Sequence, residues 1–252
     1  MPAVTSHQPG SFCWVELSTN DGAAARKFYT ELFGWTIRDV PIGEGEVYTI
    51  FLNGDRDVAA MYAGSQGSGA PPNWMSYVAV DNVDEAVIRA KELGGNVLAE
   101  PMDVGESGRM AVLTDSQGAA FAVWKANEHI GVRVRDEVNA LCWNELQARD
   151  VDAAKRFYPP LFGWRMKESD EYTEWHLGEN AVGGAMPSNA PAEVPSFWIP
   201  YFAVEDCDAA TQKAQSLGGS VHVPCTDIPH VGRFSVLVDP TGAAFAVIKT
   251  MM

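Results

Sequence analysis

Residues 13–35 read CWVELSTNDGAAARKFYTELFGW, and residues 142–164 read CWNELQARDVDAAKRFYPPLFGW. Further along, YVAVDNVDEAVIRAKELGG (77–95) matches YFAVEDCDAATQKAQSLGG (201–219), and the offset between the copies changes from 129 to 124 residues. Repeats of this length indicate that one unit has been duplicated along the chain. The sequence therefore predicts two similar domains.

The ends of the matching segments set the predicted domain boundaries. The first domain covers residues 11–126, the second covers 140–250, and residues 127–139 link them. In each domain a strand, a helix and three more strands are expected twice, with Asp21 placed to cap the first helix and Gly34 to end it. One such module cannot bury its sheet face alone. We therefore expect an α+β chain of four βαβββ modules, paired into two curved, mainly antiparallel sheets with concave clefts.

Two prolines interrupt the second copy of the first helix. Pro159 and Pro160 stand where the first copy has Thr30 and Glu31. Proline lacks a backbone N–H, and its ring clashes with the preceding helical turn. We expect this helix to stop or kink near Tyr158.

Composition restricts the class of partner. The 252 residues carry a formal net charge of −15 and are 46% hydrophobic, which is typical of a globular protein. Nucleic acid and anionic membrane surfaces are unfavourable partners, because both attract clustered Lys and Arg. The charge permits a neutral or cationic small ligand, and it also needs no explanation beyond solubility.

The cysteines and the hydropathy pattern predict the compartment. No two of the four cysteines have C-x-x-C spacing, and the N-terminal residues lack the pattern of a secretory signal. No apolar run approaches the ~18 residues of a membrane span. We expect a soluble, cytoplasmic protein with free thiols.

The repeated segments resemble a known superfamily. FYTELFGW (28–35), AVDNVDEAVIRAKELGG (79–95) and DSQGAAFAVW (115–124), with their second copies, resemble the vicinal oxygen chelate superfamily. That superfamily includes glyoxalase I, the bleomycin-resistance proteins and the extradiol dioxygenases. The tandem form is most similar to its two-domain, mycobacterial-antigen-type, glyoxalase-like branch. A shared fold does not by itself give a reaction.

The resemblance implies a divalent metal, held by side chains on the first and last strands of the modules. In the first domain these positions fall on Trp14, near Met75, on Ala122 and near Ala60 or Met61. None of these is a usual ligand for such an ion. In the second domain they fall on Trp143, Ile199, Ala246 and the region 184–186. We therefore expect no metal and no cofactor.

Two glutamates are the candidate catalytic residues. Glu16 lies two residues after Trp14, and Glu145 lies two residues after Trp143, so each pair shares one face of a strand. A carboxyl on an otherwise apolar face has a raised pKa and suits a general acid or base, or the partner of a cationic ligand. The alternative is a hydrogen-bonded structural carboxylate.

Further residues are candidates for ligand binding. Tyr77 and Tyr201 should point into the clefts and orient a ligand oxygen, or they are ordinary half-buried sheet tyrosines. Arg109 and Arg233 could anchor an anionic group, or form ion pairs at the sheet edge. Aromatic and apolar side chains complete the predicted site, although core packing explains such residues as well. They are Trp14, Tyr48, Met61, Trp124 and Trp143.

These expectations lead to more than one functional hypothesis. The first is metal-independent binding or sequestration of a small, mainly apolar or aromatic molecule, as in the bleomycin-resistance proteins. The second is a lyase, isomerase or hydroxylase-like enzyme for a small carbonyl compound, with Glu16 or Glu145 as acid or base. In a third, one domain is purely structural. The tandem predicts a monomer with pseudo-dimeric domains, or a weak homodimer.

Overall fold

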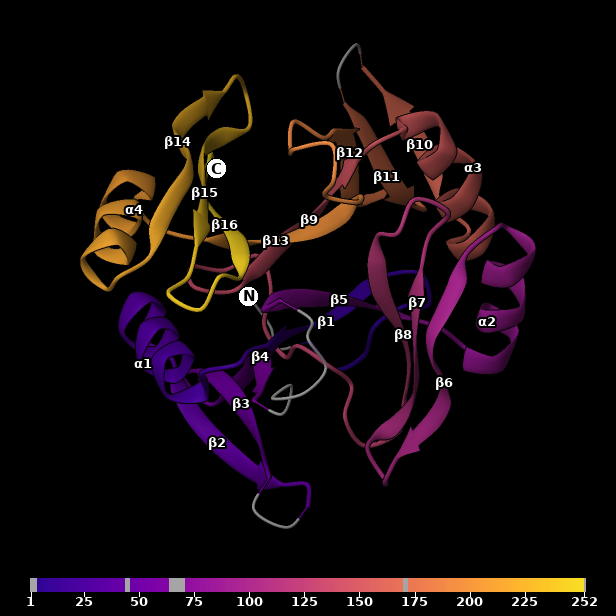
Figure 1. Ribbon diagram of the computed structural model, residues 1–252, viewed down its shortest axis with the longest axis horizontal. Helices are drawn as coiled ribbons and strands as arrows, with labels where there is room; N and C mark the ends of the chain where they lie inside the picture. The colour runs from indigo at the N-terminus through magenta and orange to yellow at the C-terminus, as the bar shows by residue number, and fades with distance from the viewer. Residues whose placement is uncertain (1–3, 44–45, 64–70, 170–171, 252) are drawn as a thin grey trace.

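The computed structural model describes residues 4–43, 46–63, 71–169 and 172–251. Each half of the chain forms one open sheet of eight strands accompanied by two helices (Figure 1). The elements of the first half are β1 (Phe12–Ser18), α1 (Gly22–Phe33), β2 (Thr36–Pro41), β3 (Val47–Asn53), β4 (Arg56–Tyr62), β5 (Asn73–Ala79), α2 (Val83–Glu92), β6 (Asn96–Val104), β7 (Gly108–Thr114) and β8 (Ala120–Ala126).

The second half repeats this order of elements. Its members are β9 (Leu141–Ala148), α3 (Val151–Phe162), β10 (Arg165–Glu168), β11 (Thr173–Leu177), β12 (Asn180–Pro187), β13 (Phe197–Ala203), α4 (Cys207–Ser216), β14 (Ser220–Ile228), β15 (Gly232–Val238) and β16 (Ala244–Thr250). The repeat seen in the sequence is thus a repeat of structure.

The strand order is the same in both sheets. It is β2-β3-β4-β1-β5-β8-β7-β6 in the first and β10-β11-β12-β9-β13-β16-β15-β14 in the second. The two modules of a sheet join at its centre through an antiparallel pair, β1 with β5 and β9 with β13. Within each module the first strand also pairs in parallel with the last, as β1 does with β4 and β5 with β8. The prediction of an α+β chain built from tandem βαβββ modules is confirmed.

The helix of the first module begins and ends on the residues that the sequence predicts, and the helix of the third module has equivalent residues at its ends. The Asp21 carboxylate accepts a hydrogen bond from the backbone N–H of Ala24 over 2.9 Å, and Asp150 caps α3 in the same way. Gly34 and Gly163 end the two helices in the left-handed conformation, with φ of 68° and 71°. Glycine adopts this conformation without steric cost.

The expected interruption of α3 is wrong. The helix passes Tyr158 and continues to Phe162, with Pro159 and Pro160 in its last turn. The prolines remove two backbone N–H donors, each worth about 1 kcal/mol in a net hydrogen bond. Tyr158 is fully buried and Phe162 is 8% exposed, and burying an aromatic side chain stabilises by about 1.5–3 kcal/mol. Packing therefore outweighs the local preference for a break.

The two domains contact each other through their helices. Figure 1 shows α1 beside α4 and α2 beside α3, so each helix pair contains one helix from each domain. The Tyr29 hydroxyl on α1 donates to the Asp239 carboxylate of the second domain over 2.9 Å. The Tyr158 hydroxyl on α3 donates to Asp115 of the first domain over 3.1 Å. The domains are thus joined by two equivalent buried hydrogen bonds.

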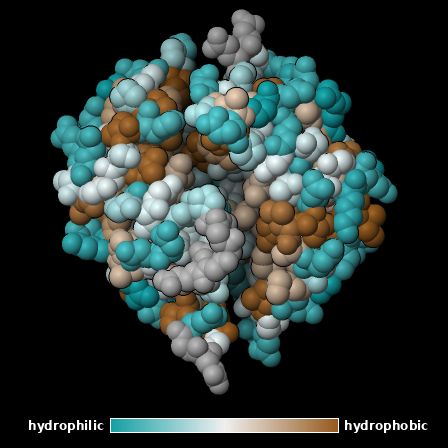
Figure 2. Space-filling model, viewed as in Figure 1, coloured by the Kyte–Doolittle hydropathy of each residue, from teal (hydrophilic) through white to brown (hydrophobic). Residues whose placement is uncertain are grey.

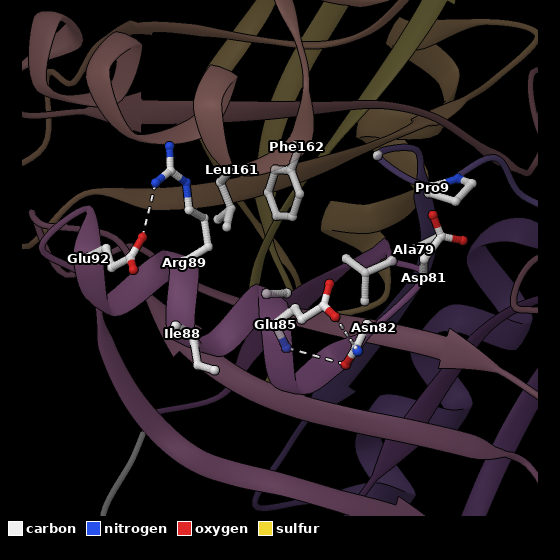
Figure 3. Close-up of a pocket in the computed structure, with 13 residues that line it drawn as sticks. Pro9, Ala79, Asp81, Asn82, Glu85, Ile88, Arg89, Glu92, Leu161 and Phe162 are labelled. Atoms are coloured by element: carbon white, nitrogen blue, oxygen red, sulfur yellow. Dashed lines mark hydrogen bonds and ion pairs between the residues drawn. The ribbon is translucent and has the colours of Figure 1, made fainter.

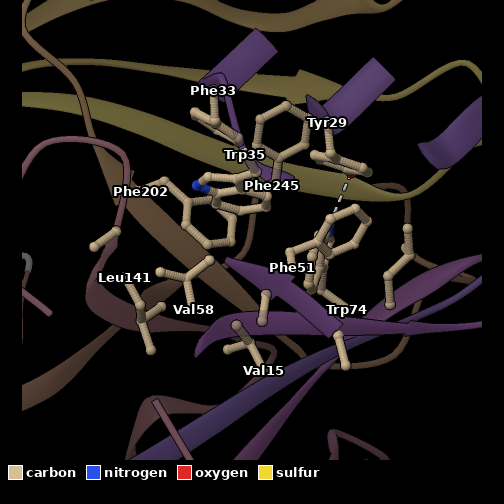
Figure 4. Close-up of a cluster of buried hydrophobic side chains, with 14 of the residues drawn as sticks. Val15, Tyr29, Phe33, Trp35, Phe51, Val58, Trp74, Leu141, Phe202 and Phe245 are labelled. Atoms are coloured by element: carbon tan, nitrogen blue, oxygen red, sulfur yellow. Dashed lines mark hydrogen bonds between the residues drawn. The ribbon is translucent and has the colours of Figure 1, made fainter. Parts of the chain in front are cut away.

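Aromatic rings from both domains form a shared core. In Figure 4 the rings of Phe33, Trp35 and Trp74 from the first domain face Phe202 and Phe245 from the second. The ring centroids of Trp35 and Phe202 lie 5.4 Å apart, and those of Trp74 and Phe202 lie 5.5 Å apart. Such pairs contribute about 0.5–1.5 kcal/mol each beyond the area they bury. This core fixes the two sheets relative to one another.

Each sheet has one face covered by helices and a second face, which we call the helix-free face. Val15 and Leu17 of β1 pack into the core cluster that includes α1. Alternation along the strand directs Trp14 and Glu16 to the opposite face. Tyr77 of β5 pairs with Trp14 and shares its face. The equivalent residues of the second sheet are Trp143, Glu145 and Tyr201.

The surface mixes polar and apolar areas. In Figure 2 apolar residues gather in patches on both sides of a central furrow. Within the described residues, no helix has the length and apolar character needed to cross a membrane.

Candidate functional site

A hydrogen-bonded network surrounds Glu16 on the helix-free face of the first sheet. The Tyr48 hydroxyl donates to Glu16 Oε2 over 2.7 Å, and the Trp14 indole Nε1 donates to the Tyr48 hydroxyl over 3.0 Å. The Tyr77 side chain also hydrogen-bonds to the Glu16 carboxyl. We call Trp14, Glu16, Tyr48 and Tyr77 the Glu16 network. It brings together four of the predicted site residues.

The same arrangement occurs on the second sheet. The hydroxyls of Tyr201 and Tyr172 donate to the two oxygens of Glu145 over 2.8 and 3.1 Å. The Trp143 indole donates to the Tyr172 hydroxyl over 2.8 Å, and Gln147 donates to Glu145 over 2.7 Å. We call Trp143, Glu145, Tyr172 and Tyr201 the Glu145 network.

Tyr172 is a site residue that the sequence reasoning missed. It corresponds to Tyr48 at the offset of 124, the offset that also relates Tyr77 to Tyr201. The distance between the two copies changes from 129 to 124 residues somewhere after the first helix. Few residues match between the copies in that stretch. Applying the later offset to Tyr48 would have found Tyr172.

A glycine makes room for the second network. Gly184 pairs with Glu145 across β12 and β9, and a Cβ atom built on Gly184 would overlap the ring and hydroxyl of Tyr172. The position equivalent to Gly184 in the first sheet is Ala60, which pairs with Glu16. The Tyr172 ring therefore lies closer to the backbone of β12 than a side chain at position 184 would allow.

Burial controls the protonation of both networks. It raises the pKa of Glu16 and of Glu145, and the hydrogen bonds from the tyrosines oppose that rise. Burial and the neighbouring carboxyl raise the pKa of Tyr48 well above its ordinary value, and they also raise that of Tyr201. The phenols thus remain protonated donors at neutral pH, while the carboxyls are easier to protonate than in water.

The donor set does not fit the divalent metal that the resemblance implies. Trp14, Met75 and Ala122 occupy positions on this face where the resemblance places ligands, and they offer no suitable donor. Glu16 is a single carboxyl, and its partner Tyr48 keeps its proton. Among the described residues, no three His, Cys, Asp or Glu side chains come together as a possible metal site.

The two helix-free faces differ in how far they are covered. The ring of His129, in the segment that follows β8, lies edge-on to Trp14 with centroids 4.6 Å apart. The Trp124 indole donates to the His129 carbonyl oxygen over 2.9 Å. Trp14 is only 3% exposed, whereas Trp143 is half-buried. Burial also lowers the pKa of His129, which favours a neutral ring against Trp14.

Met61 lies on the opposite face from the one predicted. In β4 the residue that pairs with Glu16 is Ala60, and Met61 pairs with Leu17. Because paired residues share a face, Met61 points to the helix-bearing side with Leu17. A shift of one residue in the predicted register accounts for this error.

The two arginines also lie away from the networks. Arg109 and Arg233 are on the helix-bearing side of β7 and β15, where each bridges a helix and a neighbouring strand. Both arginines form the ion pairs at the sheet edge that the sequence offered as the alternative to ligand binding. Neither of these two guanidinium groups faces the helix-free side. The partners are Asp84 and Asp103 for Arg109, and Asp208 and Asp227 for Arg233.

A pocket of about 490 Å³ lies where α2 meets the end of α3 (Figure 3). Four of its polar side chains bond in pairs: Asn82 donates to Glu85 over 2.9 Å, and Arg89 pairs with Glu92 over 3.0 Å. No residue of the Glu16 network or of the Glu145 network lines this pocket.

A second pocket of about 390 Å³ lies beside α1. Arg26, Thr49 and Met61 line it, and the Arg26 guanidinium is bonded to Asp39 and to the Thr49 hydroxyl. The arginines of both pockets are therefore paired with carboxylates, and the networks remain the candidate site.

Comparisons with known proteins agree with this architecture. The family model of the glyoxalase/bleomycin resistance protein/dioxygenase superfamily matches residues 11–123 and 130–247. The Mycobacterium tuberculosis protein named "Putative glyoxylase CFP32" is 43% identical, over 99% of this chain and 98% of its own length. The Streptomyces peucetius "Anthracycline biosynthesis protein DnrV" is 36% identical, over 98% of this chain and 95% of its own.

Solved structures share the fold at low sequence identity. The Mn(II)-bound glyoxalase from Novosphingobium aromaticivorans is 13% identical with a TM-score of 0.67, covering 96% of this chain and 82% of its own. The 2,3-dioxygenase LapB from Pseudomonas sp. KL28 is 11% identical with a TM-score of 0.67, and the match covers 100% of this chain and 94% of LapB. The tandem modules and the match of the family model to both halves show that the chain belongs to the glyoxalase/bleomycin resistance protein/dioxygenase superfamily.

Proposed function

We propose that the chain binds, and thereby sequesters, a small, mainly apolar or aromatic molecule on its helix-free faces, chiefly that of the second sheet, without a metal. The observation that carries this proposal is the network of tryptophan, glutamate and two tyrosines, which occurs once on each sheet. Each network sets indole and phenol rings beside one polar group. Sites for small organic ligands commonly combine an apolar lining with a few placed polar groups.

The second sheet offers the more accessible aromatic surface. Trp143, Tyr172 and Phe234 are half-buried on this face, and the rings of Tyr201 and Phe234 lie 6.1 Å apart. An aromatic ligand could stack against these rings, and its hydroxyl or carbonyl oxygens could bond to the tyrosine hydroxyls. The name of the relative DnrV refers to the biosynthesis of anthracyclines, which are polycyclic aromatic compounds with such oxygens.

A second candidate function is proton transfer in a lyase, isomerase or hydroxylase-like reaction on a small carbonyl compound. The observation that favours it is the raised pKa of Glu16 and Glu145. A general acid or base works best when its pKa lies near the working pH. Glu145 would take the proton as base, and Tyr172 or Tyr201 would hold the substrate oxygen.

The role of the first domain and the oligomeric state of the chain follow from the same contacts. Because His129 covers Trp14, the first domain would act mainly as a structural partner. The shared core of the two domains supports a monomer whose domains imitate a dimer. A cytoplasmic location belongs to the same proposal, because all four cysteines are free thiols.

Calorimetric titration of the full chain with a dihydroxyanthraquinone tests the binding proposal. We expect saturable binding that weakens about tenfold in Tyr172→Phe, which loses one hydrogen bond to the ligand. The matched change Tyr48→Phe, in the network whose tryptophan is covered by His129, should leave the affinity close to that of the parent. Absence of binding, or equal weakening by both changes, would contradict the proposal.

Chromatography of the ligand after incubation separates the two candidate functions. Recovery of unchanged ligand supports sequestration. A product that forms with the parent chain and not with Glu145→Gln supports proton transfer instead.

A further inference from the structure

Two cysteines of the second domain lie in contact outside the networks. The Sγ atoms of Cys207 and Cys225 are 3.6 Å apart. Cys207 is the first residue of α4, and Cys225 lies in β14. The Cys225 thiol also lies 3.2 Å from the Thr211 hydroxyl oxygen. A disulfide has an S–S length of about 2.05 Å, so a shift of about 1.5 Å would join the two sulfurs.

We propose that Cys207 and Cys225 form a reversible disulfide that links α4 to β14, and that this thiol pair is a site of oxidative modification. Reducing compartments keep structural disulfides rare, and reversible ones there usually sense oxidants. The pair touches none of the network residues, so this inference is independent of the proposed ligand site.

The thiols of Cys207 and Cys225 differ in solvent exposure, and this difference indicates which of them an oxidant attacks first. Cys225 is half-buried and is the thiol that an oxidant reaches first. Cys207 is 2% exposed, and burial together with its contact to Cys225 raises its pKa to about 12. Cys207 is therefore protected from direct attack and reacts once Cys225 has been activated beside it.

The other two cysteines lack a sulfur partner. The Cys13 thiol donates to the Tyr77 carbonyl oxygen and the Cys142 thiol to the Tyr201 carbonyl oxygen. They occupy equivalent places in the two domains, and burial raises the pKa of both. They serve as internal controls within the same chain.

The first domain has no cysteine at the positions that correspond to Cys207 and Cys225. At the offset of 124, Val83 and Pro101 stand where the second domain has Cys207 and Cys225. The nearby ion pairs of the arginines Arg109 and Arg233 occur in both domains. The helix and strand are therefore held without sulfur in one domain, and the thiol pair is an addition to the other.

A low-molecular-weight disulfide can oxidise the two thiols by thiol–disulfide exchange. The Cys225 thiolate attacks one sulfur of glutathione disulfide, which forms a mixed disulfide and releases one glutathione. The Cys207 sulfur then attacks the Cys225 sulfur and gives up its proton, which forms the protein disulfide and releases the second glutathione. Two protein thiols are oxidised, one external disulfide is reduced, and the two protons pass to the released thiolates.

Mass spectrometry of the full chain after incubation with glutathione disulfide tests this proposal. We expect a loss of two hydrogen atoms (about 2 Da), a crosslinked pair of peptides containing Cys207 and Cys225, and reversal by dithiothreitol. The oxidised chain should melt several degrees higher, because the bond closes a short loop in the unfolded chain.

Matched variants make the result decisive. Cys142→Ser should retain the crosslink, and Cys225→Ser and Cys225→Ala should abolish it while keeping the circular dichroism of the parent. A persistent mixed glutathione adduct, a crosslink that includes Cys13 or Cys142, or the absence of any reaction would overturn the proposal.

Discussion

The Tyr201 hydroxyl donates a hydrogen bond of 2.8 Å to the carboxyl of Glu145, a residue that is only 7% exposed. In the first sheet Tyr77 holds the same relation to Glu16. A buried carboxyl costs free energy unless it is hydrogen-bonded or protonated. The tyrosines supply the hydrogen bonds and burial favours the proton, so each network can hold its carboxyl in either protonation state.

The raised pKa of Glu145 predicts a specific dependence of stability on pH. The folded protein binds this proton more tightly than the unfolded chain, whose glutamate pKa is about 4.3. The resulting stabilisation is complete below that value and is lost as the pH rises through the folded pKa. Glu145→Gln cannot titrate, so its unfolding free energy from urea denaturation should fall less over this range. Parallel curves for parent and variant would refute the raised pKa.

Tryptophans at equivalent positions should differ in their effects. Trp14 is buried beside His129, so Trp14→Ala should lower the unfolding free energy by about 3–5 kcal/mol. Trp143 is half-buried, so Trp143→Ala should cost less stability and should weaken anthraquinone binding more. Urea denaturation and calorimetry of both variants measure the two effects. The opposite ranking in either experiment would count against the second sheet as the binding face.

The hydrogen bonds between the domains should contribute to stability in equal measure. Tyr29→Phe removes the hydrogen bond to Asp239 Oδ2, and Tyr158→Phe removes the one to Asp115 Oδ2. Each change should lower the unfolding free energy by about 1–2 kcal/mol, because a buried carboxylate oxygen loses its partner. Thermal denaturation of the two single variants and the double variant tests this. Unchanged melting temperatures would show that these bonds do not stabilise the interface.

Gly184 should be required for the Glu145 network. Gly184→Ala would place a methyl group where Tyr172 lies, so the phenol should move away from Glu145 and ligand affinity should fall about tenfold with the lost hydrogen bond. The reverse change in the first sheet, Ala60→Gly, adds no atoms and should leave the affinity intact. A crystal structure of Gly184→Ala with Tyr172 in its parent position would disprove the steric argument.

Much of the fold could be predicted because the duplication repeats most of the local signals. Asp21 and Gly34 end α1 with side-chain and backbone chemistry that depends on a few neighbouring residues. The prolines of α3 were misjudged because their local preference is outweighed by the burial of Tyr158 between two domains. Contacts between distant segments, such as Tyr29 with Asp239, leave no local pattern in the sequence.

The candidate site could be predicted in part, for a similar reason. Alternation along β1 places Trp14 and Glu16 on one face, and this needs only the strand. Met61 required the register of β4 against β1, which depends on pairing between strands and changes face with a shift of one residue. The cover that His129 provides depends on the path of the linker, which no strand or helix pattern describes.

Ligand binding by this chain should need no metal, and titration with and without metal tests this most directly. The full chain is treated with a chelator, assayed for residual metal, and titrated with the dihydroxyanthraquinone alone and after one equivalent of Zn²⁺ or Mn²⁺. We predict one affinity, the same within about twofold, in all three states. Binding that vanishes with the chelator and returns with one equivalent of metal would contradict the account.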